Sequence, residues 1–140
     1  MLNAAELSSL KLATIALMIA GGLLVAMASH PAMAYLPNLF FDLVFLPFDG
    51  AEKASEPTSR LLAALAGGGF VGLGVTFWLI ISKLLPREPE LAKSIMTTGL
   101  LGWFVVDSTG SVLSGAWFNV VLNCVILGCF LIPLRSLSRP

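Results

Sequence analysis

The sequence predicts an all-α integral membrane protein: a four-helix transmembrane bundle with a re-entrant or interfacial apolar first loop. Of the 140 residues, 57% are hydrophobic and only 11% are charged, whereas about a quarter of a typical soluble domain is charged. Four charge-poor runs are long enough, or nearly so, for the roughly 20 helical residues that a bilayer crossing needs. The length allows one domain, which we assign to residues 1–140.

Prolines and charges bound the four predicted spans. Pro57 lies just ahead of the second span, where a proline in the first helical turn is tolerated, and Pro86 ends that span. Pro89 and Glu90 suit the start of the helix that contains the third span, and Pro133 is expected to end the fourth. The spans cover residues 12–29, 61–82, 94–113 and 117–134.

The first run has a second interpretation as a secretory signal peptide. Lys11 precedes it, and Ala32-Met33-Ala34 has the small-x-small form of a cleavage site. The apolar stretch is longer than the roughly 7–15 residues usual in signal peptides, so we expect it to remain as an anchor. Asn3 and Glu6 have the spacing of a capping box and predict a short helical turn ahead of it.

Lysine and arginine are distributed unevenly between the two sides. With four spans, six of the eight basic residues share the side of the two termini, and Lys53 and Arg60 lie opposite. The positive-inside rule then places both termini in the cytoplasm. We therefore expect a multi-pass protein of a bacterial inner membrane. The six residues are Lys11, Lys83, Arg87, Lys93, Arg135 and Arg139.

The first loop, residues 31–49, is too apolar to be solvated and too short and proline-broken to span. A re-entrant or interfacial segment fits it best. Its aromatic side chains would form a lid over the helix ends or, alternatively, a docking surface for a lipid or another membrane subunit. These residues are Tyr35, Phe40, Phe41, Phe45 and Phe48.

Small residues recur every four positions in the second span, at Ala64, Gly68 and Gly72. Small side chains let two helix backbones approach closely in lipid. We expect this ridge to be buried against another helix, either within the chain or in a homo-oligomer or a complex with other membrane subunits.

Asp107 is an acid within the third span, and an intramembrane acid is a functional-site hypothesis by default. If the chain turns near residues 114–115, Asp107 lies level with Asn123 on the fourth span, and Ser111 lies level with Asn119. Buried polar groups need hydrogen-bond partners. We therefore predict that the acid, the two amides and the hydroxyl form one cluster.

Two further residues are candidates for this region. Arg60 begins the second span, and its long side chain could reach down to Asp107 as a counter-ion. His30, the only histidine, ends the first span. We interpret it as a helix-end or interfacial residue; the alternatives are an axial ligand for a tetrapyrrole or a pH-responsive partner of Asp42 or Asp107.

The sequence contains none of the common metal-binding or catalytic motifs. No His/Cys spacing suits zinc, and there is no nucleophile elbow or phosphate-binding glycine loop. Cys124 and Cys129 lie about 140° apart around a helix, so we interpret them as small buried hydrophobes without a mutual disulfide. Eight acids balance eight bases, which disfavours nucleic-acid binding. None of these patterns specifies a cofactor.

These observations favour a non-enzymatic membrane subunit. It would assist or pack against a larger membrane complex, or bind a lipid or a hydrophobic cofactor. The alternative is a small carrier or proton-linked channel that uses Asp107, Asn119 and Asn123. An intramembrane hydrolase is favoured less, because Ser108 and Ser111 lack a positioned base.

The predicted topology is testable by labelling single introduced cysteines with a membrane-impermeant reagent. A cysteine at Arg87 should be protected in intact cells and a cysteine at Glu52 should be labelled, because the lysine and arginine bias retains the second loop inside. The reverse labelling pattern would invert the topology.

Overall fold

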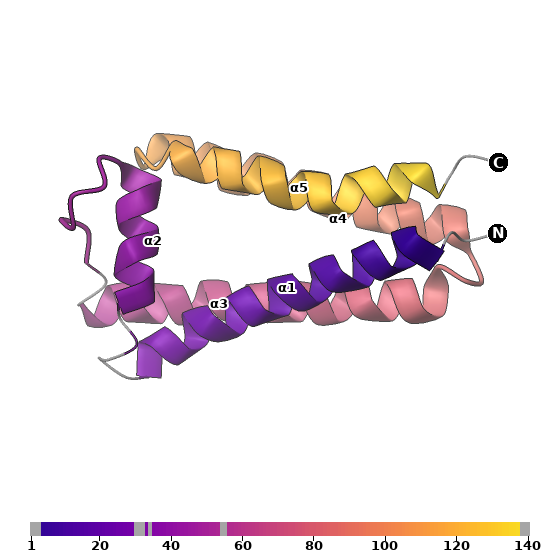
Figure 1. Cartoon of the computed structure of the whole chain (residues 1–140), viewed down its shortest axis with the longest axis horizontal. Coiled ribbons are helices and arrows are strands. Elements are labelled where there is room, and N and C mark those ends of the chain that lie inside the picture. The colour runs from indigo at the N-terminus through magenta and orange to yellow at the C-terminus, as the bar shows by residue number, and fades with distance from the viewer. Residues whose placement is uncertain (1–3, 30–32, 34, 54–55, 138–140) are drawn as a thin grey trace.

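The computed structural model describes residues 4–29, 33, 35–53 and 56–137, and the regular elements within them are all helical. Helices α1, α3, α4 and α5 lie along the long axis of the molecule, whereas α2 lies across one end (Figure 1). The elements are α1 (Ala4–Ser29), α2 (Tyr35–Phe45), α3 (Pro57–Leu79), the π-helical turn η2 (Ile80–Leu84), α4 (Pro89–Leu113) and α5 (Phe118–Ser136).

Three segments within the described residues are long and apolar enough to cross a membrane. They are Ala4–Met27, Pro57–Leu84 and Phe118–Ser136. Helix α4 has a comparable length of 25 residues, but its acid, serines and threonines make it more polar. The all-α class and the membrane character are therefore supported, and three rather than four helices meet the criterion for a span.

The prolines that begin helices behave as predicted, and the one expected to end a helix does not. Pro57 and Pro89 occupy the first turns of α3 and α4. Pro133 lies inside α5, which continues to Ser136, so the prediction that it ends the fourth span is wrong. A proline removes one backbone donor, but α5 continues past it, and Leu137 N at the end of the helix donates to Pro133 O at 3.1 Å.

The apolar core lies toward the end of the molecule that holds the start of α1 and the end of α5 (Figure 1). Phe77 of α3 meets Phe130 of α5 edge to face, with ring centroids 5.3 Å apart. Side chains from α1, η2 and α4 complete this core. Its buried members are Leu10, Leu17, Phe77, Ile81, Leu85, Ala92, Met96, Leu100, Phe130 and Leu134.

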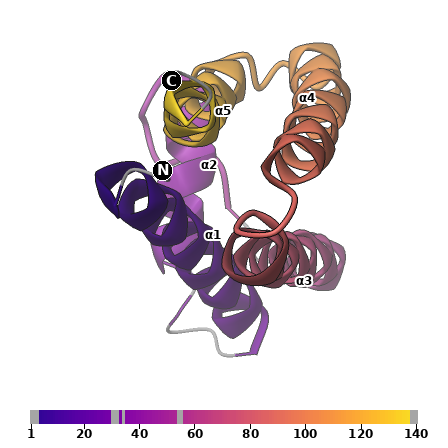
Figure 2. The same cartoon turned by 90° about the vertical axis from the view of Figure 1, so that its right-hand side faces the viewer.

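Seen along the long axis, α1 lies beside α3 and α4 lies beside α5 (Figure 2). The contact between α1 and α3 is made at glycines. A Cβ atom added to Gly67 would lie 2.5 Å from the carbonyl oxygen of Gly21, and one added to Gly21 would lie 2.5 Å from the carbonyl oxygen of Gly67. A Cβ added to Gly74 would lie 2.5 Å from Met18 Cγ. These glycines therefore permit an approach that a larger residue would prevent.

The glycines of the predicted packing ridge do not face α1, the helix that packs most closely on α3. Gly68 and Gly72 are exposed, and a Cβ added to either would meet nothing within 4 Å. Ala64 is only half-buried. Helix α1 approaches α3 at Gly67 and Gly74 instead, and among the described residues none lies within 4 Å of a Cβ added to Gly68 or Gly72. The alternative of an oligomer or partner face stays a prediction.

The two cysteines also differ from the prediction. Cys124 and Cys129 are free, as their spacing indicates, but both are exposed on α5 rather than buried. The apolar character of α5 on all sides hides which residues face its neighbours, because a membrane helix carries apolar residues toward lipid as well as toward protein.

The apolar first loop contains the 11-residue helix α2, which rises about 16 Å and cannot cross a bilayer. It contacts α1 and α5 at the end of the molecule opposite the apolar core. Tyr35 and Phe48 are largely exposed, whereas Val44 is buried. Phe40 and Phe41 pack edge to face.

Enlarging the close-packed glycines of α3 should destabilise the chain, whereas enlarging Gly22 or Gly102, which face open space, should not. We expect Gly67→Leu and Gly74→Leu each to lower the free energy of unfolding by about 1–3 kcal/mol, because the added atoms would force the backbones apart. Gly22→Leu and Gly102→Leu are the matched controls, because a Cβ added at either position would meet nothing within 4 Å. Thermal unfolding in detergent measures the difference, and equal losses at all four positions would contradict this packing.

Candidate functional site

The site is built on the antiparallel pair α4 and α5, which a tight turn connects. Gly115 has a φ of +83°, a left-handed conformation that glycine adopts without strain. Ala116 N donates to Ser111 O at 2.8 Å and Gly115 N donates to Val112 O at 3.1 Å. This pair of bonds is the Schellman arrangement that ends many helices. The turn fixes the register of the two helices.

Asp107 accepts hydrogen bonds from two amides of α5. Nδ2 of Asn123 donates to Oδ2 of Asp107 at 2.6 Å, and Nδ2 of Asn119 donates to the same oxygen at 3.1 Å. Asn119 and Asn123 are one helical turn apart and therefore share a face. The hydrogen bonds expected from the hairpin register are thus present.

Two serines of α4 complete this polar network. Nδ2 of Asn123 also donates to Ser108 Oγ at 3.2 Å, and Nδ2 of Asn119 also donates to Ser111 Oγ at 2.9 Å. Each amide nitrogen has two N–H donors, and both amides use both. Ser111 Oγ in turn donates to the backbone oxygen of Asp107 at 2.8 Å.

Because several of these side chains are buried, their polar groups need hydrogen-bond partners within the protein. Asn123 is 3% exposed, and Ser108 and Ser111 are buried beside it, while Asp107 and Asn119 are half-buried. A buried donor without an acceptor costs about 1–3 kcal/mol, so the network stabilises the pairing of α4 with α5. Ser108 belongs to it, although the cluster predicted from the sequence was built on Asp107, Ser111, Asn119 and Asn123.

The described hydrogen bonds of the Asp107 side chain come from Asn119 and Asn123 and do not include Arg60. Arg60 lies in the first turn of α3, where its backbone N donates to Glu56 O at 3.1 Å. None of the ion pairs among the described residues joins it to Asp107. His30 lies outside the described residues, as do Asn3, Ala32 and Ala34. The expectations for these residues stay predictions.

Asp42 is buried in α2 and takes part in a separate acidic group. Its Oδ1 accepts hydrogen bonds from Asp49 N at 3.2 Å and Gly50 N at 2.6 Å. Oxygens of Asp42, Asp49 and Glu52 lie within 4.8 Å of one another, close enough to hold a metal ion together. Glu52 Oε2 is buried and makes no hydrogen bond.

Sequence reasoning missed this acidic group. The Asp49-Gly50 pair is a turn signal, and Gly50 does adopt a positive φ of 77°. That signal alone does not show that the turn folds back onto Asp42, seven residues earlier.

Comparison of the chain with protein-family models, with curated proteins and with solved structures returns no match.

Substitutions of Asp107 should separate the loss of hydrogen bonds from the loss of charge. We expect Asp107→Leu to lower the free energy of unfolding by about 1–3 kcal/mol, because the amides of Asn119 and Asn123 each lose an acceptor. Asp107→Asn should cost little, since its side-chain carbonyl can accept the same two bonds. Val106→Leu, at a neighbouring position that is 74% exposed, is the control. A Leu variant at position 107 as stable as this control would show that the network does not hold the helices together.

Proposed function

We propose that this chain is a non-enzymatic accessory subunit that packs against a larger membrane complex through its apolar outer surface. One observation carries the proposal: the chain buries little of its own apolar surface. Only 28% of the residues in the most apolar part of Ala4–Met27 are buried, and the corresponding share is 22% in both Pro57–Leu84 and Phe118–Ser136. Lipid can cover such surface, and so can another membrane subunit.

The proposal includes four crossings, with α4 as the third and with both termini in the cytoplasm. The 25 residues of α4 would extend about 37 Å, which exceeds the roughly 30 Å of hydrocarbon. The cost of placing Asp107 in the membrane is reduced because two amides donate to it. The bias of lysine and arginine toward the side of the termini supports the orientation.

The exposed glycines of α3 give the proposed contact face. Gly68 and Gly72 have open space where a Cβ would lie, and Leu61 and Leu65 are exposed on the same helix. A partner helix could approach the backbone closely here, in the way that α1 does at Gly67. This face therefore suits a homo-oligomer or a complex with other membrane subunits.

The geometry of the polar network favours a structural role over catalysis. Ser108 and Ser111 accept hydrogen bonds from amides, and Ser111 donates its proton to a backbone oxygen. A nucleophilic serine needs a base within hydrogen-bonding reach, and none of the described contacts gives either serine one.

A small carrier or proton-linked channel is the second candidate, and one observation favours it. Both amides bind Oδ2 of Asp107, and none of the described hydrogen bonds involves Oδ1. That oxygen could take up a proton or meet a cation. Such a protein would lose transport in proteoliposomes with Asp107→Asn, which cannot exchange a proton, whereas an accessory subunit would tolerate the change.

Association is the direct test of the accessory role. We expect the chain, solubilised in mild detergent from its native membrane, to elute with a mass well above 14.8 kDa plus its detergent. Gly68→Leu and Gly72→Leu should each reduce that larger species severalfold, because a leucine would separate the two backbones. Gly102→Leu is the matched control, since Gly102 is equally open but lies on α4.

Size-exclusion chromatography with light scattering measures the mass of the protein part, and mass spectrometry identifies the components. A monomer that elutes without partners, in amounts unaffected by Gly68→Leu and Gly72→Leu, would contradict the proposal.

A further inference from the structure

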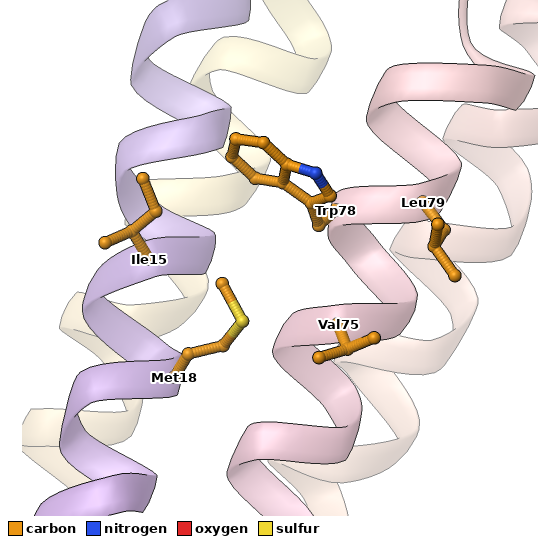
Figure 3. A pocket seen from close by; sticks show the side chains of 5 residues that line it. All are labelled: Ile15, Met18, Val75, Trp78 and Leu79. Atoms are coloured by element: carbon orange, nitrogen blue, oxygen red, sulfur yellow. The ribbon is translucent and has the colours of Figure 1, made fainter.

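An open apolar groove lies between α1 and α3, in the half of the molecule that holds the apolar core. Ile15 and Met18 line it from α1, and three residues line it from α3 (Figure 3). Its volume is about 320 Å³, at the small end of the roughly 300–1,000 Å³ usual for ligand pockets. Ile15 is 38% exposed, so the groove opens outward. The residues of α3 are Val75, Trp78 and Leu79.

The groove begins where the close contact between α1 and α3 ends. Gly74 is the last glycine of α3, and Met18 of α1 packs directly against it. Beyond this contact, toward the start of α1, neither helix has a glycine that faces the other. The Trp78 indole reaches across toward α1 and closes that end of the groove (Figure 3).

The positive charge of Lys11 lies at the end of the groove that Trp78 closes. The ammonium of Lys11 lies 5.6 Å from the centre of the Trp78 ring, within the range of a cation–π contact. Lys11 is one helical turn before Ile15, so both side chains project from the same face of α1. None of the described hydrogen bonds or ion pairs joins this ammonium to an acid.

Lysine and tryptophan together indicate the depth of this end. Tryptophan is enriched where hydrocarbon meets headgroups, and lysine near the end of a span extends its ammonium toward the same level. The groove would then run from headgroup depth into the hydrocarbon, along the lipid-facing side of α1 and α3.

We propose that this groove binds one acyl chain of an anionic phospholipid, whose phosphate pairs with Lys11. The apolar lining suits the chain, the size suits one chain rather than a whole lipid, and the ammonium supplies the complementary charge. A zwitterionic lipid would fill the groove with the same chain, but its own cation would compete with Lys11 for the phosphate. The inference requires that α1 and α3 cross the membrane, and it does not depend on the accessory role.

The test uses Trp78 as the reporter. In the variant Trp103→Phe, Trp117→Phe, Trp78 is the remaining tryptophan of the three in the chain. The protein is reconstituted in phosphatidylcholine vesicles that contain a small fraction of lipid with brominated acyl chains, which quench nearby tryptophan. Brominated phosphatidylglycerol should quench Trp78 more than the same fraction of brominated phosphatidylcholine.

Removing the lysine should remove that preference. We expect Lys11→Gln to reduce the binding constant for phosphatidylglycerol relative to phosphatidylcholine about fivefold, the size of effect expected for one basic residue at an anionic membrane surface. Arg87→Gln is the charge-matched control, because Arg87 is exposed in the turn between η2 and α4. Equal quenching by the two lipids, or equal losses in the two variants, would overturn the proposal.

Native mass spectrometry of the chain with all its tryptophans gives an independent measurement. The same two phospholipids are added to the detergent-solubilised protein, and bound copies are counted. Val75→Trp should fill the groove and reduce bound phosphatidylglycerol severalfold, whereas Val106→Trp, at an exposed position of α4, should not. Unchanged binding in Val75→Trp would show that the lipid lies elsewhere and would overturn the proposal.

Discussion

A helix surrounded by lipid gains almost no hydrophobic free energy by moving against another helix, so its contacts must come from close packing and hydrogen bonds. The two helix pairs meet this constraint differently. Helices α1 and α3 approach at Gly21 and Gly67, whereas α4 and α5 are joined by the bonds of Asp107. The pairs then meet in a shared apolar core that includes Phe77 and Phe130.

The apolar core and the polar network therefore lie toward opposite ends of the molecule. The buried apolar side chains gather toward the end with the start of α1, and the polar network lies toward the end covered by α2. Hydrogen bonds depend on direction and distance, whereas apolar packing tolerates small shifts. The position of α5 relative to α4 is therefore defined most strictly around Asn119 and Asn123.

The sequence predicted the polar network better than the packing of α3, for a physical reason. A tight turn at Gly115 sets the register of an antiparallel pair, so Asp107 and Asn123 could be placed opposite each other by counting. The small residues of α3 occupy more than one face, and their spacing could not show which face meets α1. That choice depends on Gly21, more than 40 residues away in the chain. The return of the Asp49 turn to Asp42 likewise depends on tertiary structure.

The Gly115 turn also bears on how the chain enters a membrane during synthesis. An aspartate at the centre of a hydrophobic segment opposes insertion by about 2.5–3.5 kcal/mol, and by less near its ends. The amides that bind Asp107 follow it by 12 and 16 residues, so they leave the ribosome almost together with it. In the proposed four-crossing topology, α4 and α5 would therefore partition into lipid as a preformed hairpin with the acid already bonded, whereas α1 would reach the bilayer before its partner α3 has been made.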